Sequence, residues 1–225
     1  MGGLCSCCKK DEKEDKLKIK SVKINNIDDI FNEAASPFND AVSMRTDFEN
    51  AVTEFKKAAG HDGKDSLKET VLEVKERFPN LKLRMENGPK FVLTTGQSKE
   101  RDQNVEDIGA RLEESMNKIG DTATELVKLL PDAVSRAKDI LDKRAPHIIN
   151  SIKDSGLTPL QIPGSLKNAN DNIHEFKKVP KVAEDIKKTV EEFSTDFKAT
   201  VEALEGKAEN HEQDSDETSP LLANA

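Results

Sequence analysis

The fold is decided by residues 27–59, IDDIFNEAASPFNDAVSMRTDFENAVTEFKKAA. Apolar residues, with Arg45 as the one polar exception, recur in this stretch at alternating steps of four and three. This is the spacing of one narrow apolar face of an α-helix. Serine caps a helix well and proline fits its first position, so Ser36-Pro37 marks a helix start. We therefore expect a short helix over 27–35 and a longer one over 37–59, stopped by Gly60. The face consists of Ile27, Phe31, Ala34, Phe38, Ala41, Arg45, Phe48, Val52, Phe55 and Ala59.

Three later segments repeat this helical pattern, over 65–78, 98–154 and 165–208. A proline inside a helix removes a backbone donor and clashes with the preceding turn, so it should kink or split the helix. The prolines at such positions are Pro131, Pro146 and Pro180. The long segments should therefore be bent rods that pack side by side.

Residues 81–95 break the helical pattern. Polar and apolar residues alternate over 81–85, and a β-branched and apolar run follows over 90–95. Asn87-Gly88 stands between the two runs, and this dipeptide is a strong signal for a β-hairpin turn. An isolated hairpin is marginal in water, so this one must pack on the helices or on a partner.

The composition agrees with narrow apolar seams rather than a thick core. The 225 residues include no Trp and no Tyr, and the hydrophobic and charged classes each make up 35%. We predict a mainly all-α fold: an elongated antiparallel bundle of long, proline-kinked amphipathic helices with one small β-hairpin. The body is expected over 27–208, between an N-terminal anchor tail (1–26) and an acidic, disordered tail (209–225).

The N-terminus carries an acylation pattern. Residues 1–6, MGGLCS, match M-G-x-x-x-[ST], so Gly2 is the expected myristoylation site. One myristoyl chain binds membranes only marginally, and a second signal is needed for stable anchoring. The expected second signal is palmitoylation of Cys5, Cys7 and Cys8, the only cysteines of the chain. Over these ten residues the start resembles the acylated tails of peripheral kinases and small G-protein subunits.

A lysine-rich segment follows the cysteines. Residues 9–26 hold seven Lys against four acids, a net charge of +3, and such a run attracts anionic lipid. The alternative is a solvated linker without a lipid role. The lysines expected to contact lipid headgroups are Lys9, Lys10, Lys16, Lys18, Lys20 and Lys23.

The C-terminal tail contains a candidate sorting signal. Glu217, Leu221 and Leu222 have the [DE]-x-x-x-L-[LI] spacing and resemble the acidic dileucine peptides that clathrin adaptor complexes bind. The alternative is an acidic solubilising tail that ends in Leu-Leu by chance. Ser219, which precedes Pro220, is a candidate site of proline-directed phosphorylation.

No catalytic motif stands out, so we expect a protein that is not an enzyme and needs no cofactor or metal. The four His are scattered, and no phosphate-binding loop, nucleophile elbow or zinc-binding HExxH pattern occurs. The net charge of −8 argues against nucleic acid as a partner. No apolar run reaches the roughly 18 to 20 residues that span a bilayer.

These features together predict a lipid-anchored, non-enzymatic helical scaffold or adaptor on the cytosolic face of the plasma membrane or of endosomes. Its expected partners are the membrane surface, through acyl chains, and proteins bound by helix faces, with clathrin adaptors as one candidate. Two alternatives stay open: a membrane-shaping crescent built as a homodimer, and a lipid-inserting or pore-associated helical protein. The net charge of −6 over residues 27–204 opposes the crescent, which needs a positive concave face.

Overall fold

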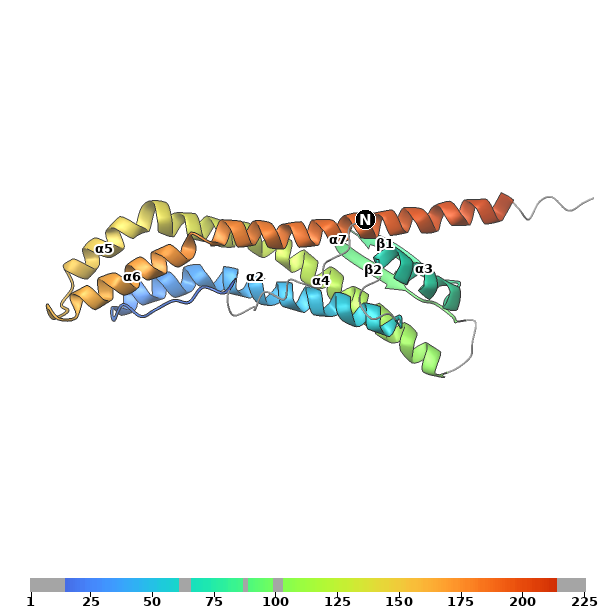
Figure 1. The fold of residues 1–225 in the computed structure, drawn as a ribbon, viewed down its shortest axis with the longest axis horizontal. Coiled ribbons are helices and arrows are strands. Elements are labelled where there is room, and N and C mark those ends of the chain that lie inside the picture. The colour runs from blue at the N-terminus through green and yellow to red at the C-terminus, as the bar shows by residue number, and fades with distance from the viewer. Residues whose placement is uncertain (1–14, 61–65, 87–88, 99–102, 214–225) are drawn as a thin grey trace, which may run out of the picture.

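The computed structural model describes residues 15–60, 66–86, 89–98 and 103–213, with side chains to residue 205. These residues form a long rod of helices with a small hairpin on its side (Figure 1). The predicted class, a mainly helical elongated bundle with one antiparallel β-hairpin, is confirmed. The elements are α2 (Asn25–Ala58), α3 (Leu67–Arg77), β1 (Lys82–Glu86), β2 (Lys90–Thr94), α4 (Gln103–Asp139), the π-helix η1 (Ile140–Arg144), α5 (Ala145–Lys153), α6 (Ile162–Phe176) and α7 (Val179–Gln213).

Three long helices run along the rod. Helices α2 and α4 pack against each other, and α7 lies along both of them (Figure 1). Helices α5 and α6 form one end of the rod, while α3 and the hairpin lie toward the other end. Helix α7 continues to Gln213, so residues 209–213, which composition assigns to a disordered tail, are helical.

Helix α2 is continuous through Pro37, and the predicted division into 27–35 and 37–59 is wrong. Proline has no N–H, so the carbonyl of Glu33, four residues earlier, loses its helical partner. Arg136 of α4 donates a hydrogen bond from Nη1 to this carbonyl oxygen at 3.2 Å. Phe31 and Phe38 are fully buried on either side of the proline. A neighbouring helix therefore satisfies the freed acceptor, and packing keeps both turns in one helix.

The other prolines act differently. Helix α4 also continues through Pro131, so this proline does not split it. Pro146 lies in the first turn of α5, directly after the π-helix η1, and a π-helical turn is a common cause of a helix kink. Pro180 lies in the first turn of α7, after the break at residues 177–178. The predicted segment over 165–208 is thus two helices, interrupted next to Pro180 as expected.

The hairpin lies across α4, and two glycines of α4 make room for it. Strands β1 and β2 are antiparallel, with Met85 opposite Phe91. A Cβ atom at Gly120 would lie 2.7 Å from both the backbone N and the backbone O of Phe91. At Gly109 it would lie 3.0 Å from Oγ1 of Thr95, directly after β2, and 3.1 Å from the ring of Phe78, directly after α3. The hairpin therefore packs on the helices, as its marginal intrinsic stability requires.

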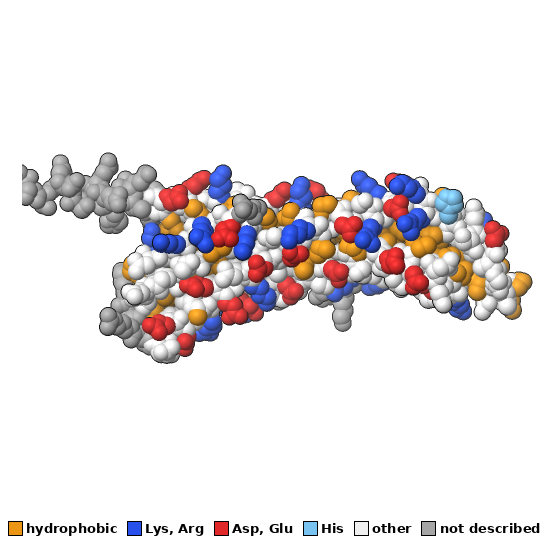
Figure 2. All heavy atoms as spheres, turned by 180° about the vertical axis from the view of Figure 1, so that it is seen from behind, with side chains coloured by type: hydrophobic (Ala, Val, Ile, Leu, Met, Phe, Trp, Pro, Cys, Tyr) orange, Lys and Arg blue, Asp and Glu red, His pale blue; other side chains and the backbone are white. Residues whose placement is uncertain are grey.

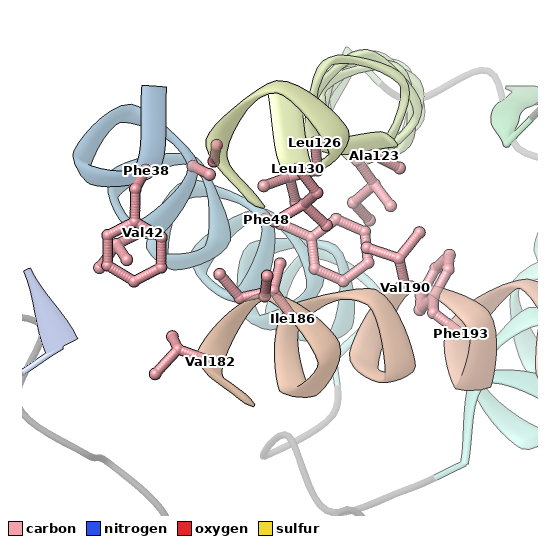
Figure 3. Packing of buried hydrophobic residues seen from close by; sticks show 14 of the residues in the cluster. Phe38, Val42, Phe48, Ala123, Leu126, Leu130, Val182, Ile186, Val190 and Phe193 are labelled. Atoms are coloured by element: carbon pink, nitrogen blue, oxygen red, sulfur yellow. The ribbon is translucent and has the colours of Figure 1, made fainter. Parts of the chain in front are cut away.

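The core is a seam of phenylalanine and aliphatic side chains between α2, α4 and α7. Figure 3 shows the ring of Phe48, from α2, among Leu126 and Leu130 of α4 and Ile186 and Val190 of α7. The rings of Phe48 and Phe193 also pack edge to face, with 5.4 Å between their centroids. The seam residues predicted on α2 are buried, apart from the partly exposed Arg45 and Val52.

Candidate functional site

The structure divides the predicted site residues into two groups. One group lies outside the described residues: Gly2, Cys5, Cys7, Cys8, Lys9, Lys10, Glu217, Ser219, Leu221 and Leu222. The other group consists of Lys16, Lys18, Lys20 and Lys23, which lie on an extended segment before α2. We call residues 15–24 the N-terminal strap.

The strap is packed against the bundle, although the sequence places it in a tail separate from the body. Its Leu17 and Val22 side chains are buried in the main hydrophobic cluster. Hydrogen bonds join its backbone to α2 and α6, which are distant in sequence. The folded body therefore begins before residue 27, where the sequence analysis placed its start.

Asparagines of α2 and α6 hold the strap backbone, and one of them, Asn168 of α6, donates to the carbonyl of Ser21 at 2.8 Å. Asn172 of α6, which is fully buried, accepts a hydrogen bond from the N–H of Lys20 and donates one to the carbonyl of Lys20, both at 2.8 Å. Asn39 of α2 accepts from the N–H of Leu17 at 2.8 Å. An amide side chain both donates and accepts, so Asn172 binds the strap as a neighbouring β-strand would.

Charged contacts fix the strap at Asp15 and at Lys20. Arg45 of α2 and Asp15 form an ion pair with 2.7 Å between Nη2 and Oδ2, and both side chains are largely buried. The Lys20 ammonium lies 2.7 Å from Asp171, and this hydrogen bond lowers the pKa of Asp171. Lys20 is therefore shared between α6 and solvent rather than fully available to a lipid surface.

Glu175 of α6 adds a pH-dependent contact. Burial raises the pKa of Glu175, but hydrogen bonds from the Lys178 ammonium and from the backbone N–H of Lys18 oppose it. The net pKa lies below the ordinary value of 4.5. The Lys178 ammonium also donates to the carbonyl of Lys16 at 3.1 Å. The ionised form of Glu175 is thus the one that holds the strap.

A second feature is an apolar groove of about 590 Å³ between α4 and α7. Val127, on its wall, is 48% exposed, which is unusual for a valine in a helix of the seam. Exposed charged residues, Lys138, Glu184, Lys187 and Glu191, lie around its edge. The apolar lining consists of Val127, Leu130, Pro131, Val134, Pro180, Ala183 and Val190.

A third feature is the end of the rod between α5 and α6. Leu160 in the connecting loop is 94% exposed. Figure 2 shows hydrophobic side chains at this end, and along the rod a broken apolar line between interspersed acidic and basic side chains. These apolar surfaces are the ones on which a protein or lipid partner could gain free energy by burial.

Two other kinds of site are absent from the described residues. None of the helices in that part of the chain is both long enough and apolar enough to pass through a membrane. The described residues also contain no group of three or more His, Cys, Asp or Glu side chains placed to hold a metal ion.

Comparison of the chain with protein-family models, with curated proteins and with solved structures found no match.

Sequence reasoning missed the strap and the groove. A signal for the strap exists, because Leu17, Ile19, Val22 and Ile24 are apolar residues spaced through the lysine-rich segment. Asn39 and Asn172 carry no such signal, since an asparagine on a helix usually faces solvent. Val127 stands next to the predicted seam, and only the packing of α7 shows that it borders a groove.

Proposed function

We propose that the protein is a lipid-anchored, non-enzymatic helical scaffold on the cytosolic face of the plasma membrane or of endosomes. The observation that carries this proposal is the start MGGLCSCCKK, which combines the acceptor glycine Gly2, three adjacent thiols and two lysines. Two acyl chains on neighbouring residues provide the stable attachment that one chain lacks.

The strap supports a scaffold role for the helical rod. Asp15 is paired with Arg45, and Leu17 is buried, so the described chain is fixed to the rod from residue 15 onward. An anchor on residues 2–8 would therefore be joined to a rigid body by a short segment. Attachment at this point would hold the rod close to the bilayer, with its exposed apolar residues available to proteins.

The surface charge favours a scaffold over a membrane-shaping crescent. Acidic and basic side chains alternate along the face in Figure 2 and do not separate by sign. Ion pairs along one helix also occur in the described chain, such as Lys187 with Glu191 and Arg136 with Asp132. A face of paired charges offers little net attraction to an anionic bilayer.

The test is the membrane fraction of Gly2→Ala in cells. This variant should move to the cytosol, because thiol acylation normally depends on the first chain to bring the cysteines to the membrane. The triple change of Cys5, Cys7 and Cys8 to Ser is the matched control, since it keeps the myristoyl site. It should leave weak, reversible binding. A Gly2→Ala protein that stays on membranes would contradict the proposal.

A further inference from the structure

We propose that the apolar groove between α4 and α7 binds the protein's own N-terminal acyl chain when the protein is off the membrane. This inference rests on the proposed acylation of Gly2. The acyl chain would then have two alternative binding sites, the bilayer and the groove. Competition between these sites would make the fraction of protein on the membrane adjustable.

The position of the strap places the groove within reach. Arg45, which holds Asp15, lies three residues before Phe48 on α2. Phe48 packs among Leu130 and Val190, which also line the groove (Figure 3). Asp15, the first described residue of the chain, and the groove therefore lie at about the same level along the rod.

The length of the segment is sufficient. Asp15 lies thirteen residue steps after Gly2, and an extended chain of that length spans at most about 45 Å. A helix with its side chains is roughly 10–12 Å wide, so even a path around a whole helix is shorter than this limit. The C-terminal Leu221 and Leu222 are poorer candidates for the groove. They follow α7, which ends at Gln213, more than twenty residues beyond Val190 of the groove. At 1.5 Å per residue the helix carries its end roughly 30 Å or more away from Val190.

The chemistry of the groove suits a hydrocarbon chain. Its walls are aliphatic side chains and two prolines, and its charges stand at the edge, where they stay hydrated. The volume of about 590 Å³ lies within the roughly 300–1,000 Å³ of sites that enclose small ligands. The stretch from Val127 to Lys138 is only about 17 Å of helix, which is short for a stable protein interface. A single acyl chain fills such a site better than a partner helix.

Disulfide mapping can test the proposal, because the chain has cysteines only at positions 5, 7 and 8. The full chain is produced in bacteria with an N-myristoyltransferase, so that it is myristoylated and its thiols stay free. Lys187→Cys places a thiol at the groove, and Lys118→Cys places one in a depression between α2 and α4. A docked acyl chain raises the effective concentration of the native thiols near Lys187→Cys. With added oxidised glutathione as the oxidant, the intramolecular disulfide should therefore form roughly tenfold faster than in the same variant with Gly2→Ala. The Lys118→Cys control should show no such dependence.

A groove variant gives an independent readout. Val127→Asp puts a charge on the groove wall at a half-exposed position, and Met85→Asp is the matched control on the hairpin, where Met85 is 42% exposed. Val127→Asp should remove the acyl-dependent disulfide and raise, several-fold, the fraction of myristoylated protein on phosphatidylcholine–phosphatidylserine vesicles. Met85→Asp should change neither.

The other outcomes overturn either the inference or the proposed function on which it rests. Equal rates with and without the acyl chain would show that the groove does not hold it. Disulfide-linked dimers at Lys187→Cys would show that a second copy occupies the groove. Unchanged vesicle binding of Val127→Asp would show that no chain was released. An intact mass without myristate would instead refute the proposed function, so the two failures are distinguishable.

Discussion

Substitution of Gly120 by alanine should destabilise the protein, although the same change stabilises most helices. Alanine at an interior helix position is usually more stable than glycine by about 0.5–1 kcal/mol. At Gly120 the new Cβ would lie 2.7 Å from two backbone atoms of Phe91, so α4 and β2 must move apart. Overpacking of this kind costs about 1–3 kcal/mol, and backbone atoms cannot rotate away as a side chain can. We expect a net loss of about 2 kcal/mol.

Thermal unfolding followed by far-UV circular dichroism measures this effect. A loss of about 2 kcal/mol corresponds to a fall in Tm of roughly 4–8 °C for a chain of this size. Gly164→Ala in α6 is the matched control, because no atom beyond its chain neighbours and the nearby backbone of its own helix lies within 4 Å of the position that its Cβ would take. It should raise the Tm slightly. Gly109→Ala should fall between the two, since its Cβ meets side-chain atoms of Phe78 and Thr95.

The refuting result is a Gly120→Ala protein as stable as Gly164→Ala. It would mean that the hairpin does not approach α4 closely and that the glycine has no packing role. Hydrogen exchange of the β1 and β2 amides locates the effect, because a displaced hairpin should exchange faster while the far end of the bundle is unchanged.

Three further predictions concern the strap and the C-terminal tail. Asn172→Ala removes both hydrogen bonds to the Lys20 backbone, so cleavage within the strap by added protease should accelerate, with a local cost of about 1–2 kcal/mol. The pKa of Glu175 is lowered in the folded protein. Its contribution to stability is therefore present above pH 4.5, the ordinary pKa, and is lost as the pH falls through the lowered pKa. Glu175→Gln should abolish this part of the pH dependence of the unfolding free energy. Leu221→Ala with Leu222→Ala should redistribute the protein between membranes in imaged cells if the dileucine spacing is a sorting signal, and an unchanged distribution would leave only a solubilising tail.

The helical seams and the hairpin were predictable because their signals are local and repeated. A face built from Phe31, Phe38, Phe48 and Phe55 can be buried only if the segment is helical, whichever helix covers it. The hairpin likewise follows from alternation around Asn87-Gly88. The elongated shape follows from segments with a single narrow apolar face, which can pack only side by side.

The strap and the unbroken α2 depended on the tertiary structure, because each rests on polar groups supplied from a distant part of the chain. Ser36-Pro37 predicts a break, and the break is absent because Arg136, about a hundred residues later, reaches the carbonyl of Glu33. The lysine-rich composition of the strap is typical of a solvated tail, yet Asn172 satisfies the backbone of Lys20. Sequence periodicity predicts which face of a helix is buried. It does not predict which distant side chain will hydrogen-bond a given backbone donor or acceptor. Here such side chains determine where a helix continues and where the folded body begins.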